Sequence, residues 1–166
     1  MIAQEGFMKT FRAVVSVMLT LGLAAPAWAD ATAFAGTNTT PANRYARGFA
    51  IGIGMLIVGF EFEYSVTSDD PSASAPSLKT GMGNVLLQTP GPIFGIQPYA
   101  TAGAGIYREE LAAQQNTGPG LNLGGGAKIN LIGPLRLRVD YRVFELGSGA
   151  LHSPAHRVYA GLNLKF

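Results

Sequence analysis

Apolar and polar side chains alternate one by one along several segments of the chain. The alternation is clearest over residues 135–143, where leucine, valine and tyrosine share one face and charged side chains share the other. A period of two predicts β-strands with one apolar face. Residues 58–66, 121–130 and 158–166 alternate in the same way. Helical periodicity is almost absent after residue 30.

Four weaker segments complete a set of eight strands. Each has about ten residues, the length that a tilted strand needs to cross a bilayer. In the first of them, alanine and threonine blur the alternation. The four weaker segments are Thr32 to Thr39, Gly48 to Met55, Lys79 to Gln88 and Ile96 to Arg108.

The connections between these segments alternate in length. Three are short, two of them with proline and glycine, and the four between them are longer and polar. Membrane barrels have this arrangement, with tight turns on one side and longer loops on the other. The short connections are 55–57, 89–93 and 132–134, and the long ones are 40–46, 67–77, 109–118 and 145–155.

Alternation alone does not say which face of a barrel points outward, because soluble lipocalin barrels alternate too. Here one face carries many charged side chains, which do not suit an apolar ligand cavity. The other face carries rings such as Phe60, Phe62 and Tyr64, too bulky to pack together inside a narrow barrel. Aromatic residues also cluster near strand ends, as in interfacial girdles. The sequence therefore predicts an all-β fold, an eight-stranded antiparallel up-and-down transmembrane β-barrel.

The N-terminal segment has the features of a cleavable signal peptide. Lys9 and Arg12 precede an apolar run over residues 13–23, and Ala27-Trp28-Ala29 has the small-x-small pattern of a cleavage site. A retained membrane anchor is the alternative, but the apolar run is short for a spanning helix. We expect a signal peptide over residues 1–29, with Met8 as the alternative start, export through the Sec pathway, and a barrel domain over residues 30–166.

Composition and charge exclude several other classes of site. The chain has no cysteine, which rules out disulfides and thiolate metal sites. Its net charge of +2 does not favour nucleic acid as a partner. We expect no cofactor and no metal.

Four segments, 59–65, 99–108, 135–144 and 158–166, resemble those of small eight-stranded outer-membrane β-barrels, the family of the OmpA transmembrane domain and OmpX. The resemblance implies a location in the outer-membrane lipid, with both ends of the mature chain on the periplasmic side. In this family an alternating last strand that ends on phenylalanine resembles the signal read by the barrel-assembly machinery. The resemblance assigns that role to Tyr159, Leu162, Leu164 and Phe166.

The charged face predicts a network inside the barrel. Strands three and seven of an eight-stranded barrel stand opposite one another, so Glu61 and Glu63 are expected to face Arg138 and Arg142. Eight strands leave an interior only about wide enough for side chains. Such a network either fills and rigidifies the barrel or gates a narrow pore. The predicted members are Glu61, Glu63, Lys128, Arg136, Arg138, Asp140, Arg142 and Lys165.

Two other functions remain open. The longer loops allow a surface module for adhesion or another contact, since loops on rigid frames commonly carry function. A lipid-modifying enzyme is the less favoured alternative. His152 and His156 flank Ser153, but the sequence offers no third group to orient a base. We expect that the protein is not an enzyme.

Overall fold

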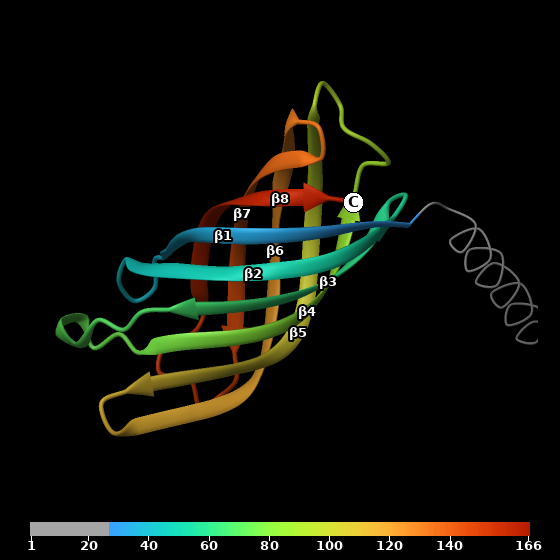
Figure 1. Ribbon diagram of the computed structural model, residues 1–166. Coiled ribbons are helices and arrows are strands. Elements are labelled where there is room, and N and C mark those ends of the chain that lie inside the picture. The colour runs from blue at the N-terminus through green and yellow to red at the C-terminus, as the bar shows by residue number, and fades with distance from the viewer. Residues whose placement is uncertain (1–26) are drawn as a thin grey trace, which may run out of the picture.

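Eight antiparallel strands close into a barrel in which each strand pairs with the next and β8 pairs with β1 (Figure 1). This computed structural model describes residues 27–166. The predicted strand count and topology are confirmed, and the described part of the chain has no helix long and apolar enough to cross a membrane. The strands are β1 (Ala27–Asn38), β2 (Arg44–Met55), β3 (Val58–Thr67), β4 (Ser77–Gln88), β5 (Ile96–Leu111), β6 (Gln114–Ile132), β7 (Leu135–Leu146) and β8 (Ala155–Lys165).

The alternation of the sequence sorts side chains between the inside and the outside of the barrel. On β3, Glu61 and Glu63 are buried in the lumen, while Phe60 and Phe62 are 46% and 48% exposed on the outer wall. On β7 every second residue from Arg136 to Arg142 is buried. The predicted orientation, with charges inside and apolar groups outside, is confirmed on both strands.

The two ends of the barrel differ. At the termini end, the start of β1 and the end of β8 lie together, and backbone hydrogen bonds of 3.0 and 2.9 Å join Ala29 to Phe166. This end also holds the connections 56–57, 89–95 and 133–134. The loop end holds the connections 39–43, 68–76, which contains the short helix η1 (Pro71–Ala73), 112–113 and 147–154.

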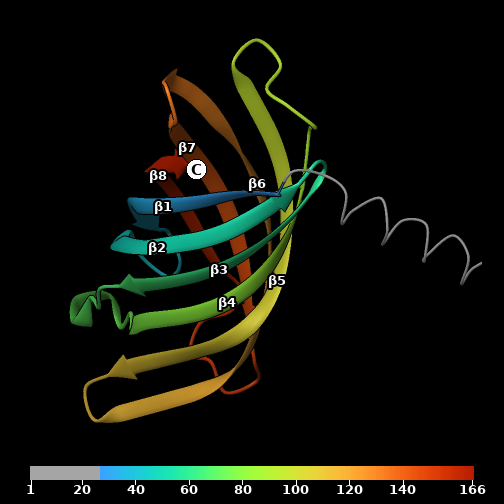
Figure 2. The same cartoon turned by 45° about the vertical axis from the view of Figure 1, so that its right-hand side comes forward.

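Two connections differ from the predicted lengths. The segment 109–118, expected as a polar loop, forms a hairpin with only Ala112 and Ala113 at its turn, because β5 and β6 stay paired as far as Leu111 and Gln114. This hairpin projects from the loop end (Figures 1 and 2). The turn expected at 89–93 continues to residue 95, so the strict alternation of short and long connections was wrong.

Strand boundaries also differ from the predicted ones at the first two strands. β1 begins at Ala27, five residues before the predicted Thr32, and β2 begins at Arg44 instead of Gly48. At the start of β1, alanines give little contrast between the faces. At the start of β2, pairing with β1 extends the strand back to Arg44. The predicted signal peptide lies outside the described residues except for its cleavage tripeptide, which forms the first three residues of β1. Its cleavage remains a prediction.

The lumen at the loop end contains an apolar cluster that the sequence analysis did not identify. Six side chains from β4, β5, β7 and β8 pack against one another there, each at most 5% exposed. They fill the barrel between the charged part of the lumen and the loops. The cluster consists of Leu78, Met82, Tyr107, Phe144, Leu146 and Ala155.

Candidate functional site

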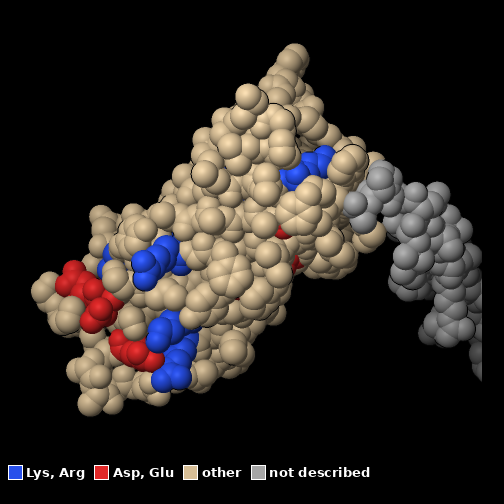
Figure 3. All heavy atoms as spheres, viewed as in Figure 1, with Lys and Arg blue, Asp and Glu red and all other residues tan. Residues whose placement is uncertain are grey.

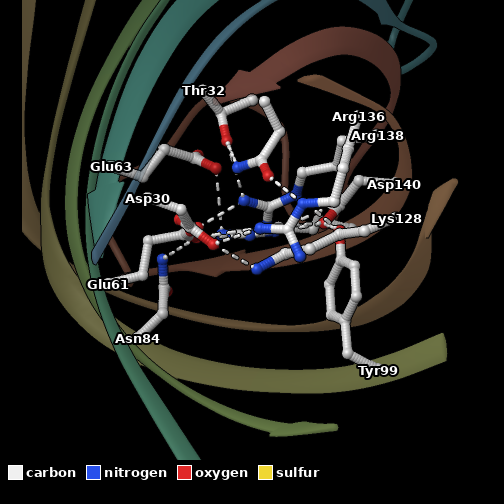
Figure 4. Close-up of polar contacts among 12 residues, drawn as sticks. Asp30, Thr32, Glu61, Glu63, Asn84, Tyr99, Lys128, Arg136, Arg138 and Asp140 are labelled. Carbon is white, nitrogen blue, oxygen red and sulfur yellow. Dashed lines mark hydrogen bonds and ion pairs between the residues drawn. The ribbon is translucent and has the colours of Figure 1, made fainter. Parts of the chain in front are cut away.

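Carboxylates on β3 meet arginines on β7 across the middle of the lumen (Figure 4). Glu61 binds both Arg138 and Arg142, with 2.9 Å between Arg142 Nη2 and Glu61 Oε1. Glu63 lies 3.1 Å from Arg142 Nη1. The structure thus brings together the two glutamates and two arginines that the opposition of these strands predicted.

Asp140 lies on β7 between the two arginines and contacts both. Its Oδ1 is 3.0 Å from Arg142 Nε, and its Oδ2 is 3.3 Å from Arg138 Nη2. With Arg157, these groups form what we call the lumenal network, in which three carboxylates face three guanidinium groups. Every member is at most 5% exposed, and the charges balance. The members are Glu61, Glu63, Arg138, Asp140, Arg142 and Arg157.

Arg157, on β8, is a member that sequence reasoning missed. Its guanidinium pairs with Glu63 and donates a 2.7 Å hydrogen bond to Ser65 Oγ. The rings of Phe34, Phe144 and Tyr159 surround it, with centroids 4.7 to 5.2 Å from the guanidinium carbon. Arg157 lies next to the last loop, before the clear alternation begins, but its position two residues from Tyr159 was a usable signal of its face.

Tyr99, on β5, joins the network through its hydroxyl. The hydroxyl donates to Asp140 and accepts a 2.7 Å hydrogen bond from Arg138 Nε. Gly126, on β6, makes room for this contact, because a Cβ there would lie 2.7 Å from the Tyr99 hydroxyl and 2.1 Å from the carbonyl oxygen of Val139. The absence of a side chain at Gly126 thus lets the Tyr99 ring reach the lumenal network.

A second group of charges lies nearer the termini end. Asp30 Oδ2 is 2.6 Å from Lys128 Nζ and 3.1 Å from Arg136 Nη2. Arg136 also donates to Asn163 and Gln97. We call Asp30, Lys128 and Arg136 the Asp30 cluster. Lys128 and Arg136, both expected in the charge network around Glu61 and Glu63, therefore pair with Asp30 instead, and sequence reasoning did not assign Asp30 to the lumen.

The Asp30 cluster opens into a cavity of about 230 Å³ at the termini end, which we call the vestibule. Lys165 lines its rim instead of joining the lumenal network, so its predicted place was wrong. The Lys165 ammonium lies 3.7 Å from the centroid of the Trp28 ring. Two cations of the Asp30 cluster and Lys165 thus face the vestibule beside one side-chain carboxylate, that of Asp30.

The predicted assembly residues on β8 divide between the two faces. Leu162 and Leu164 are exposed on the outer wall, and Phe166, just after the strand, is 67% exposed. Tyr159 points into the lumen and stacks on Phe34 with 4.1 Å between the ring centroids. Recognition of this strand by an assembly machinery stays a prediction.

The two histidines are not placed beside the serine between them. The Ser153 hydroxyl bonds the backbone of Leu146, while His156 Nδ1 lies 2.7 Å from the Tyr141 hydroxyl. His152 Nε2 is 3.3 Å from the carbonyl oxygen of Ser74. The arrangement therefore does not supply the hydrogen bond between nucleophile and base that acyl transfer requires.

Comparisons with known proteins identify the fold. No protein-family model matches the chain, and neither does any curated protein. Among solved structures, the N-terminal β-barrel domain of Pseudomonas aeruginosa OprF aligns with a TM-score of 0.62 at 18% identity, over 84% of this chain and 97% of that one. Neisserial surface protein A (NspA) aligns with a TM-score of 0.62 at 16% identity, over 84% of this chain and 96% of that one. The chain therefore has the fold of the small eight-stranded outer-membrane β-barrels.

Proposed function

We propose that the protein is an integral outer-membrane barrel whose lumen is closed to ions in its resting state. Exposed apolar side chains on the outer wall support the membrane location, because soluble proteins rarely expose so large an apolar surface to water. The shared fold of OprF and NspA supports it as well. The proposal includes export through the Sec pathway and insertion through the last strand. Examples of the outward side chains are Ile51, Ile53, Phe60, Phe62, Leu123 and Leu162.

The closed lumen is the observation that carries the proposal. Arg138 and Arg142 are fully buried although they lie in the middle of the barrel. Their guanidinium groups are held on several carboxylates from two strands, so neither side chain is free to swing aside alone. The apolar cluster adds a second barrier at the loop end. We infer that the lumen stabilises the barrel and does not conduct.

A narrow gated pore is the second candidate, and one observation favours it. The vestibule gives water access to the termini side of the lumen as far as Lys128 and Arg136. The remaining barriers are the lumenal network and the apolar cluster. Loss of carboxylates from the network would free arginines to move, and the barrel would then open if the network is the gate.

Single-channel recording in a planar bilayer tests both candidates. We expect the refolded residues 30–166 to be silent, with an unboiled-gel mobility shift as the check that the barrel has closed. The test variant combines Glu61→Gln with Glu63→Gln. Glu145→Gln is the matched control, because it removes the same charge from a barrel strand, but Glu145 is exposed on the outer wall and does not face the lumen.

The outcomes separate the candidates. Discrete current steps in the unmodified barrel would overturn the closed resting state. Steps in the double variant alone would assign the network as a gate. Silence of both proteins, with closed barrels, would leave the lumen as a stabilising core and remove the pore.

A further inference from the structure

Three cations point outward from the barrel wall near the loop end. They are Arg47 on β2, Lys79 on β4 and Arg108 on β5, and the side chains of Lys79 and Arg108 are 40% and 48% exposed. The other lysines and arginines of residues 27–166 lie elsewhere. Five are buried in the lumen, Arg44 is buried near the loops, and Lys165 is at the termini end. The outward cations at the loop end therefore belong to one side of the barrel.

These cations share a single lateral row of the sheet. Arg47 pairs with Val66, Val66 pairs with Lys79, and Lys79 pairs with Arg108. Neighbouring strands lie about 4.8 Å apart. The three charged side chains therefore emerge within reach of one anionic group or of two adjacent ones. We call Arg47, Lys79 and Arg108 the cation row.

The row borders the apolar wall. On each strand, the outward-facing residue two positions closer to the termini end carries no charge. These uncharged residues pair with one another in the same order as the row. Phe49 and Tyr64 are among them, with ring centroids 5.9 Å apart. Aromatic side chains mark the interface between hydrocarbon and headgroups in membrane barrels. The next outward position beyond the aromatic pair is therefore at the depth of lipid headgroups. The uncharged row consists of Phe49, Tyr64, Gly81 and Ile106.

The charges in the row are only partly neutralised. Glu110 Oε1 lies 2.7 Å from Arg108 Nε and 3.5 Å from Lys79 Nζ, and it also accepts from Gln115. Like charges directly opposite each other on paired strands repel, so Lys79 and Arg108 benefit from a further anion. Arg47 forms no ion pair with any residue in the described part of the chain. Three cations and one carboxylate leave a net charge of +2.

The rest of the loop end lacks such a surface. Along β1, β6, β7 and β8, the described residues present no outward lysine or arginine at this end, and Glu145 on β7 is exposed there instead. Asp69 and Asp70 lie in the connection 68–76, beyond the row. Figure 3 shows cations gathered toward the loop end of this face, with acidic side chains farther out and an uncharged stretch of wall between these cations and the charges at the termini end.

We propose that the cation row binds phosphate groups of anionic lipids in the leaflet at the loop end. The inference rests on the proposed membrane location. Strands in such barrels tilt by roughly 40°, so the row rises by about 3 Å per strand across the wall. Arg47 therefore lies nearest the hydrocarbon and Arg108 farthest from it, and the row spans the depth of a headgroup layer. Bound phosphates anchor this side of the barrel to its lipids.

Lipid selectivity tests the proposal. The barrel is refolded in vesicles of phosphatidylcholine with one fifth phosphatidylglycerol, and spin-labelled versions of each lipid report their association with the protein. Each cation near a membrane surface favours anionic lipid by up to about fivefold. Averaged over the whole boundary, we expect phosphatidylglycerol to be enriched about threefold, with an enrichment that falls as salt is added.

Three variants make the test specific. Replacing Arg47, Lys79 and Arg108 together by glutamine should lower the enrichment at least twofold, while Arg47→Lys with Arg108→Lys should preserve it. Glu110→Gln should raise the enrichment, because it releases two cations from their carboxylate. Lys165→Gln measures the contribution of the opposite leaflet. Equal enrichment by the wild type and the triple glutamine variant would overturn the proposal.

Two further outcomes identify other causes. Inorganic phosphate replacing chloride at constant ionic strength should leave the enrichment unchanged. A fall to the level of the triple glutamine variant would assign the row to free phosphate and overturn the lipid assignment. If the barrel fails to insert into these vesicles, the gel mobility shift is absent and the proposed function itself fails. Insertion without lipid preference contradicts the cation row alone.

Discussion

The lumenal network and the Asp30 cluster use the same residue types in two different settings. The network sets three carboxylates against three guanidinium groups, and Arg138 and Arg142 are fully buried. The Asp30 cluster sets one carboxylate against two cations beside the open vestibule, and the Asp30 side chain is 14% exposed. The fully enclosed network is balanced, whereas the Asp30 cluster keeps a surplus cation beside the vestibule, although Lys128 and Arg136 are themselves only 3% and 7% exposed.

The difference follows from the cost of an unpaired charge. In a dry interior an ion loses hydration that only good partners replace, so removal of one partner is strongly destabilising. Beside a vestibule, water can replace the lost partner, and the loss is smaller. The comparison therefore predicts a hierarchy of stability effects along the axis of the barrel.

Arg142→Met should produce the largest loss of stability. It removes the cation that contacts Glu61, Glu63 and Asp140, and leaves three carboxylates with two arginines. We expect the free energy of unfolding to fall by about 3–5 kcal/mol. Urea unfolding of the barrel from phosphatidylcholine vesicles, followed by gel mobility, measures the loss.

A second substitution tests whether charge imbalance is the cause. Adding Asp140→Asn to Arg142→Met leaves two carboxylates with two arginines, with Arg138 still paired to Glu61 and Arg157 still paired to Glu63. We expect the double variant to recover at least half of the loss, since contacting residues act non-additively. If Arg142→Met costs less than about 1 kcal/mol, the network behaves like an exposed surface pair, and the contrast with the Asp30 cluster disappears.

Asp30→Asn should have a smaller effect. The change leaves Lys128 and Arg136 without their carboxylate, but both line the open vestibule. We expect a loss of about 1–2 kcal/mol, between the cost of an exposed and a buried pair. The same urea titration at low and high salt is the measurement. Salt should reduce this loss more than it reduces the loss from Arg142→Met, because ions can enter the vestibule beside the Asp30 cluster but not the enclosed network. Equal salt responses would contradict the difference in water access.

The sequence predicted the faces of the barrel better than the positions along its axis. Alternation with period two assigns a side chain to the lumen, and opposition of the third and seventh strands was enough to bring Glu61 and Glu63 to Arg138 and Arg142. Nothing in that period says how deep a residue lies. Lys165 was therefore placed in the network although it lies at the rim of the vestibule.

Asp30 shows a second limit of sequence reasoning. It lies in an alanine-rich segment with weak alternation, directly after the predicted cleavage tripeptide. Asp30 was therefore expected at the start of the mature chain, before the first strand. Register with β2 and β8 places it opposite Gly52 and Lys165, inside the barrel. Pairing with two neighbouring strands supplied what the local pattern lacked.

The β5–β6 hairpin was mistaken for a loop for a related reason. The mostly polar residues from Glu109 to Gly118 form no apolar face. This part of the hairpin projects from the loop end (Figure 2), so neither of its faces needs to be apolar. Its turn also lacks the glycine or asparagine that marks most two-residue turns. Instead, Ala112 adopts a left-handed backbone with φ of 52°.

Ala112→Gly should give the smallest effect, and its sign is opposite. A left-handed backbone costs an ordinary residue roughly 1–2 kcal/mol, which glycine avoids, while the unfolded glycine chain has more entropy to lose. We expect a net gain of about 0.5 kcal/mol in the same urea titration. Ala113→Gly is the matched control, because Ala113 does not share the positive φ of Ala112 and should lose stability. Since both residues lie outside the lumen, neither change should alter the ratio of the losses from Arg142→Met and Asp30→Asn. A change in that ratio would mean that the hairpin and the lumen are coupled, and the hierarchy along the axis would then not belong to the lumen alone.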